Sequence, residues 1–167
     1  LRILSYAWIA QNAILVLSVG MRNFHYIAQH GLAYKRVGVF FFLFLTLFGL
    51  FTLYLKIRDR MTSFYLFKTN AWALYATMLV LSMVNWDSAI ARFNIHHYET
   101  TQKLDTGFLL ALSNKTLPVL MEHKELFPNP QRLIDKRIEF QEEQKNYSWL
   151  SWNLADYRAQ VFLRNNP

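Results

Sequence analysis

Long apolar runs fill most of the first half of the chain, and their length indicates which element they form. Residues 37–55 carry no charge over 19 positions, and five Phe lie between positions 40 and 48. A helix needs about 20 apolar residues to cross the roughly 30 Å hydrocarbon core of a bilayer, whereas ordinary strands are much shorter. A buried helix of a soluble protein seldom stays apolar on every face for so long. This run therefore predicts a transmembrane helix.

Two other uncharged runs, at residues 3–21 and 69–86, predict two further transmembrane helices. Gln11 and Asn12 lie near the middle of the first of them. An amide without a partner is costly in lipid, so we expect both side chains to face another helix and to hydrogen-bond there. A role for the two amides in a ligand site is the alternative.

The ends of these runs carry features of the membrane–water interface. Trp72 and Trp86 are predicted to stand near the two ends of the third run, as interfacial anchors do. The loop at residues 21–36 contains apolar positions that favour an interfacial turn of helix. Gly31 is expected to end that turn, because glycine adopts the left-handed backbone that closes many helices.

The composition changes after residue 86, where shorter amphipathic segments replace the apolar runs. The segment from Asp87 to Ile95 is predicted to continue the third transmembrane helix. Asn129 is expected to cap one later helix, and Asn153 with Asp156 gives a capping pattern for the last. The remaining helices are predicted at residues 104–112, 116–127 and 130–144.

The sequence thus predicts an all-α fold, with three transmembrane helices followed by a small helical C-terminal extramembrane domain. The membrane domain is assigned to residues 1–87 and the tail to residues 88–167. About 80 residues of short helices would be marginally stable alone, so we expect the tail to pack on the membrane part or on a partner.

The distribution of charge argues against a nucleic-acid-binding protein, although the formal net charge is +7. Residues 1–87 hold eight Lys/Arg and two acids, a balance of +6, whereas residues 88–167 hold ten and nine, a balance of +1. The excess lies in short loops between apolar runs, where membrane proteins keep it, and not on one face of a folded domain. The chain has no cysteine, which excludes disulfides and thiolate metal sites.

Asp87 and Arg92 directly follow the third apolar run and are the first candidates for chemistry. They are five residues apart, which is not an ideal spacing for a pair on one helix. We expect Asp87 to bond Arg22 or Arg36 from a loop on the same side of the membrane, which would fix the end of the helix. A proton or ion relay is the alternative, because acids near membrane spans are often functional.

Other catalytic and cofactor patterns are weak. His96 and His97 are adjacent, so on a helix they point about 100° apart and do not grip one metal as residues at i and i+4 do. No His falls within the three apolar runs, where a haem ligand would lie, and the five Gly form no phosphate-binding loop. The Ser, His and acidic residues show no nucleophile motif. The sequence therefore predicts no catalytic residue, no metal site and no cofactor.

Three stretches of the chain resemble a family of uncharacterised bacterial multi-pass membrane proteins. They are "YIAQHGLAYKR" at residues 26–36, "NWDSAIARFNI" at 85–95 and "LDTGFLLALSNKTLPVL" at 104–120. The resemblance covers roughly residues 5–120, with mild departures at His30, Ala33, Phe93 and Phe108. It implies that the chain is the C-terminal part of a polytopic protein of the bacterial cytoplasmic (inner) membrane. It carries over no catalytic residue.

Two functions of different class follow from these observations. The first is a structural or assembly subunit that docks on other membrane proteins, or on upstream spans of the same protein, through its spans and its tail. The mid-span amides Gln11 and Asn12 and the aromatic Trp149 and Trp152 favour it. The alternative is the C-terminal part of a transporter or membrane enzyme whose functional spans lie upstream. The chain begins with Leu1 and enters an apolar run at once, so we expect such upstream sequence.

The balance of positive charge between the loops predicts the side of the membrane on which the tail lies. Loops that stay in the cytoplasm carry more Lys and Arg. One side holds five near its spans: Arg2, Lys56, Arg58, Arg60 and Lys68. The other side holds four (Arg22, Lys35, Arg36 and Arg92), with Lys103 at the limit of the counted region.

We therefore expect the tail to lie outside the cytoplasm. Alkaline phosphatase fused after Pro167 should be active, because it needs disulfides that form only there. A fluorescent cytoplasmic reporter fused at the same residue should stay dark. An inactive phosphatase together with a fluorescent reporter would reverse the assignment.

Overall fold

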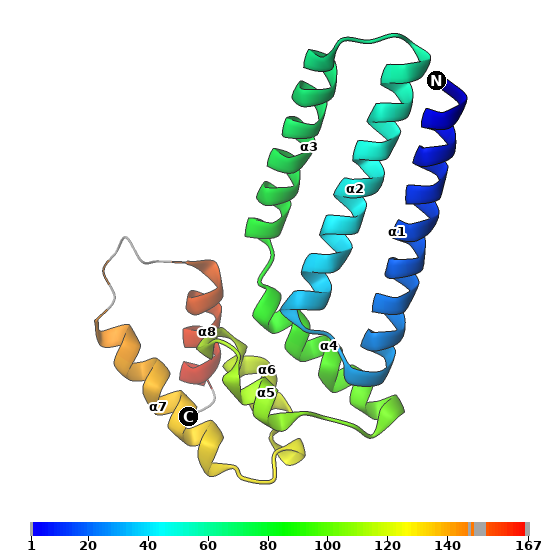
Figure 1. The fold of residues 1–167 in the computed structure, drawn as a ribbon. Coiled ribbons are helices and arrows are strands. Elements are labelled where there is room, and N and C mark those ends of the chain that lie inside the picture. The colour runs from blue at the N-terminus through cyan, green and yellow to red at the C-terminus, as the bar shows by residue number, and fades with distance from the viewer. Residues whose placement is uncertain (1, 147, 149–152, 166–167) are drawn as a thin grey trace. The chain divides into compact units, whose positions relative to one another are not determined.

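The computed structural model describes residues 2–146, 148 and 153–165, and helices account for 86% of these described residues. Within the described residues there is no β-strand. The chain divides into two compact units, Leu1–Val84 and Asn85–Pro167 (Figure 1). Trp149 and Trp152 lie outside the described residues.

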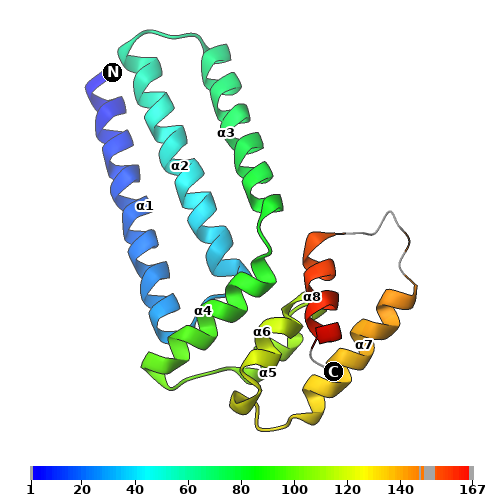
Figure 2. The same cartoon turned by 180° about the vertical axis from the view of Figure 1, so that it is seen from behind.

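The first unit consists of three long antiparallel helices, α1 (Arg2–His30), α2 (Tyr34–Arg58) and α3 (Ser63–Met83). They lie side by side in one layer with α2 in the middle (Figures 1 and 2). Both α1 and α2 are long and apolar enough to cross a membrane. The third helix, α3, reaches that standard only together with α4 (Trp86–Thr101), and the 70° bend between them fits a broken span or a re-entrant loop. The predicted fold class, an all-α chain with two or three such helices and a helical C-terminal region, is confirmed.

The turn between α1 and α2 is much shorter than the loop expected at residues 21–36. α1 runs unbroken to His30, and Gly31 then ends it with a φ of 73°, as predicted. Asn23 and Ile27, in the last turns of α1, are buried. The Nδ2 of Asn23 donates to the carbonyl of Arg36 at 3.0 Å. These contacts against α2 hold the last turns of α1 in helical form.

The third helix also has different ends from those predicted. It begins at Ser63, because the Oγ1 of Thr62 accepts from the N–H of Tyr65 at 3.4 Å and caps it. It ends at Met83, and the extended backbone of Val84 follows. The prediction that residues 87–95 continue this helix is therefore wrong.

The two tryptophans do not mark the ends of α3 either. Trp72 lies near the middle of α3, and Trp86 is the first residue of α4. Trp72 lies inside α3 because the Thr62 cap starts that helix at Ser63, before the uncharged run begins. Trp86 belongs to α4 because Asn85 caps a new helix after the extended backbone of Val84. Capping decides where a helix ends when propensity alone does not.

A polar contact joins α2 and α3 within the apolar layer. The Nδ2 of Asn70 donates to the Oγ1 of Thr52 at 3.0 Å, and the Thr52 side chain is buried. Gly49, one turn earlier on α2, lies beside the Asn70 side chain, and a Cβ there would make an ordinary contact with its Oδ1 at 3.5 Å. Thr52 and Asn70 also bond carbonyls of their own helices, those of Gly49 and Leu66. This contact fixes the register of α2 against α3.

The described residues of the second unit form seven short helices. They are α4, α5 (Thr106–Ala111), the 3-10 helix η1 (Asn114–Thr116), α6 (Leu117–Glu122), η2 (Lys124–Leu126), α7 (Gln131–Lys145) and α8 (Leu154–Asn165). Its core joins α6, α7 and α8 through Leu117, Phe140, Ala159 and Leu163.

The sequence patterns predicted the positions of most of these helices but not the points at which they are interrupted. The single helix expected at residues 116–127 is divided into η1, α6 and η2, because the backbone leaves the helical region at His123, which separates α6 from η2. The cap of α8 is confirmed: the Oδ1 of Asn153 accepts from the N–H of Asp156 at 2.9 Å, and its Nδ2 donates to the Asp156 carboxylate. Asn129 accepts from the N–H of Gln131 at 3.1 Å, one residue earlier than the N-cap position of α7.

Two threonines of α2 test the contribution of the α2–α3 contact. Thr52→Val keeps the shape of the side chain but leaves the Asn70 amide without its acceptor on α2, and we expect it to lower the free energy of unfolding by about 1 kcal/mol. Thr46→Val is the matched control, because the Thr46 hydroxyl bonds only Phe42 of its own helix. Unfolding in detergent with increasing SDS, followed by far-UV circular dichroism, measures both variants. Equal losses would contradict a specific role for Thr52.

Candidate functional site

The start of α4 carries the densest group of polar contacts in the second unit. The Oδ1 of Asn85 accepts from the N–H of Ser88 at 3.3 Å, and its Nδ2 donates to the Ser88 hydroxyl at 3.0 Å. That hydroxyl donates to the carbonyl of Lys115, at 3.3 Å. The N-cap of α4 thus also attaches its first turn to η1.

Asp87 lies in the same first turn, where a negative charge is favoured by the dipole of the helix. Its Oδ1 accepts from the N–H of Ser113 at 3.3 Å, immediately before η1. Arg36 donates to the carbonyls of His30 and Gly31, the first at 3.0 Å, and closes the C-terminal end of α1. The expected pairing of Asp87 with Arg22 or Arg36 stays a prediction.

Lys136, on α7, is a buried lysine whose ammonium group lies against the end of α5. Its side chain is only 8% exposed, and its Nζ donates to the carbonyls of Leu110, at 2.9 Å, and Leu112. Burial lowers the pKa of Lys136 below its usual 10.5, and the carboxylates of Glu139, Asp87 and Glu143 act in the opposite direction. The ammonium group supplies hydrogen bonds to carbonyls at the C-terminal end of α5, which the helix itself leaves unpaired.

Two further contacts extend this polar group to α7 and α8. The Nδ2 of Asn114 donates to the Oε2 of Glu143 at 3.0 Å. The Nζ of Lys115 lies 4.0 Å from the Oδ1 of Asp156, whose side chain is buried. We call the set Asn85, Asp87, Ser88, Ser113, Lys115 and Lys136 the α4 junction.

The other residues proposed from the sequence lie apart from this junction. Arg92 is exposed on α4. His96 is exposed and pairs with Glu99 at 3.1 Å, while the ring of His97 stacks on Phe93 with centroids 5.8 Å apart. Within the described residues, no group of three or more His, Cys, Asp or Glu side chains is placed to hold a metal ion.

The two mid-span amides differ in their surroundings. The Nδ2 of Asn12 donates to the carbonyl of Trp8 at 2.8 Å, one turn earlier on α1, so its own helix satisfies it in part. The side chain of Gln11 is exposed, and its amide makes no hydrogen bond with any residue that the structure describes. The expected contact of both amides with another helix stays a prediction.

Sequence reasoning missed Lys136 and the Thr52–Asn70 contact. Lys136 sits within a charged helix, and nothing in its neighbours marks it as the buried lysine. Gly49 and Thr52 could have indicated the contact, because small residues at i and i+3 of a Phe-rich span favour close packing against another helix. Asn70 was counted only as part of an uncharged run.

The chemistry of the α4 junction is structural. Asp87 accepts from the backbone N–H of Ser113, and Lys136 donates to carbonyls at the end of α5. Lys115 lies near the Asp156 carboxylate of α8. The arrangement holds these short helices together.

The fold and this junction define an α-helical protein with at least two helices apolar enough to cross a membrane. Residues 1–123 match the family described as "Domain of unknown function (DUF4153)", and the chain belongs to that family. No curated protein and no solved structure matches it. The matched residues include the α1–α2 turn and the start of α4, whereas α7 and α8 follow them.

The buried lysine generates a prediction with a defined dependence on pH. The pKa of Lys136 is lower in the folded chain than in the unfolded chain. At pH values between these two pKa values, Lys136 is protonated in the unfolded chain but has lost its proton in the folded chain. Stability should therefore rise with pH in the window just below 10.5. Lys136→Met should abolish that rise and, at neutral pH, lower the free energy of unfolding by about 1–3 kcal/mol, because two carbonyls lose their donor.

Lys145→Met is the matched control, because Lys145 is an exposed lysine in the last turn of the same helix. Urea unfolding of the full chain in detergent micelles, at several pH values, measures all three proteins. If the alkaline rise survives in Lys136→Met, the titrating group is another one.

Proposed function

We propose that this chain is a structural or assembly subunit of the bacterial cytoplasmic membrane, which docks on other membrane-protein subunits through α1. The polar groups of the α4 junction support an architectural role, since they bond one another and the backbone. The apolar helices α1, α2 and α3 form a single layer, which leaves long apolar faces for contact with other helices or lipid.

Gln11 is the observation that carries the proposal. It stands near the middle of α1, and its amide has no hydrogen-bond partner among the described residues. Leu15 and Ser18 follow it at helical spacing, and both are exposed. On another side of α1, Tyr6 contacts Tyr54 of α2, with ring centroids 5.5 Å apart. The face with Gln11 therefore does not serve the packing of α1 on α2.

An amide that faces lipid has no hydrogen-bonding solvent, so the free energy favours a partner that supplies one. A hydrogen bond between membrane helices contributes about 0.6–2 kcal/mol. A second membrane helix with a polar side chain or an accessible carbonyl opposite Gln11 supplies that bond. Leu15 and Ser18, one and two turns further along α1, then provide an apolar contact and a small residue next to it.

Removing the amide tests the proposal. Gln11→Leu should reduce recovery of a stoichiometric membrane partner by about threefold to tenfold, the range expected for one lost hydrogen bond of this kind. Asn12→Leu is the matched control, because the donor of Asn12 already bonds Trp8 within α1. Purification in mild detergent from native membranes, with quantitative mass spectrometry, gives the ratio of partner to chain.

Purification of the wild-type chain without any stoichiometric partner would contradict the assembly role. Equal losses in Gln11→Leu and Asn12→Leu would show that the α1 face does not select the partner. A substrate-dependent transport or turnover activity in the purified complex, lost in Gln11→Leu, would instead favour the part of a transporter or membrane enzyme.

A further inference from the structure

An apolar groove runs between α2 and α3 on one face of the helical layer. Its volume is about 860 Å³, and it includes Phe44 and Phe48 of α2 with Trp72, Ala73 and Ala76 of α3. The small side chains of the two alanines open the groove between the larger rings. At one end, near the turn between α2 and α3, it is lined by Lys68.

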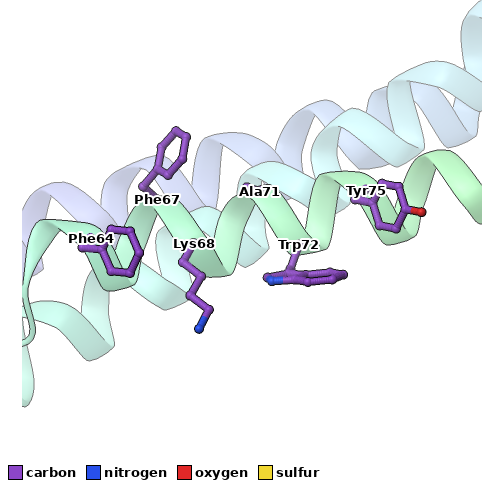
Figure 3. A pocket seen from close by; sticks show the side chains of 6 residues that line it. All are labelled: Phe64, Phe67, Lys68, Ala71, Trp72 and Tyr75. Atoms are coloured by element: carbon purple, nitrogen blue, oxygen red, sulfur yellow. The ribbon is translucent and has the colours of Figure 1, made fainter.

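A second apolar hollow, of about 440 Å³, lies on the other side of Lys68. It is formed along α3 by Phe64, Phe67, Ala71 and Tyr75. Lys68 and Trp72 line both hollows, and Figure 3 shows these two side chains projecting toward the same side of α3. Together they form a ridge with an apolar depression on each side.

The charge at this end of the layer is strongly positive. Residues 56–68 contain four Lys/Arg and one acid, a balance of +3. Arg58 is paired with Asp59 at 2.7 Å, and Lys56 donates to the Ser63 hydroxyl at 3.0 Å. Lys68 is exposed and makes no hydrogen bond or ion pair with any residue that the structure describes. Its ammonium group is therefore available to an anion.

We propose that this surface binds one anionic diacyl phospholipid, with its phosphate at Lys68. One acyl chain lies in the α2–α3 groove and the other in the hollow along α3, so that the lipid straddles Lys68 and Trp72. Two apolar depressions that meet at one free cation match the two chains and single phosphate of such a lipid. Long lysine side chains reach the headgroup level while their stems lie along apolar surface, which suits this position.

The length of the groove agrees with an acyl chain. From Lys68 to Val80, which lines its far end, α3 rises about 18 Å. One leaflet takes up half of the roughly 30 Å hydrocarbon core. A chain that starts at a phosphate near Lys68 is thus covered by protein over the depth of its leaflet.

Native mass spectrometry of the full chain in detergent tests the proposal with defined lipids. Phosphatidylglycerol should be retained about fivefold better than phosphatidylcholine with the same acyl chains, because both lipids carry the phosphate but the choline cation of the second offsets its attraction to Lys68. Lys68→Gln should remove that preference. Lys35→Gln is the matched control, because Lys35 lies in the first turn of α2, at the other end of the layer.

A second pair of variants tests the groove independently of charge. Ala76→Phe should fill the groove and reduce retention of phosphatidylglycerol severalfold, and the exposure of Ala76 makes the larger side chain tolerable for folding. Ala7→Phe places the same ring at an exposed position of α1 that lines neither hollow. Thermal melts followed by circular dichroism verify that all variants are folded.

Several outcomes would overturn the proposal. Equal retention of the two lipids, or equal effects of the two lysine variants, would indicate unselective annular lipid. Lysophosphatidylglycerol bound as well as the diacyl lipid would show that the second hollow takes no chain. Displacement of the lipid by millimolar glycerol phosphate would show that a soluble phosphate satisfies the site and that the grooves contribute nothing.

Discussion

The backbone groups at helix ends are the constraint on which this structure depends. A chain folded only as helices leaves N–H groups unpaired at each start and carbonyls unpaired at each end, and many short helices multiply those ends. Here side chains close several of them. Arg36 bonds the last carbonyls of α1, Asn85 caps α4, and Lys136 reaches from α7 to the end of α5. These side chains help to decide where those three helices begin or end and which neighbour they contact.

The same constraint explains the structural roles of two of the three stretches that resemble the family. The stretch at residues 26–36 supplies the buried Ile27, the left-handed Gly31 and the Arg36 that together form the α1–α2 turn. The stretch at residues 85–95 supplies the cap of α4 and its buried face, Ile90, Ala91, Asn94 and Ile95. Both stretches therefore supply contacts that build the fold.

The single layer of α1, α2 and α3 has a different consequence. Three helices in a bundle bury a shared core, whereas three in a layer leave both faces uncovered, and large side chains such as Phe42, Phe44 and Met78 are well exposed. In water such faces would aggregate, but in a bilayer lipid or another helix covers them. The proposed partner contact at Gln11 and the proposed lipid at Lys68 use different helices of this layer, so one chain can accommodate both.

The sequence by itself determined the class of fold, because the length and uniform apolarity of residues 37–55 leave few alternatives to a membrane-crossing helix. It also determined local devices that act within a few residues, such as Gly31 at the end of α1 and the Asn153–Asp156 cap. Only the tertiary structure decided which polar residues meet. Thr52 and Asn70 are 18 positions apart, and Lys136 is 24 from Leu112, so their contacts depend on how helices pack. Periodicity reports which face of a helix is apolar, but a hydrogen bond across two helices requires their register, which no local pattern specifies.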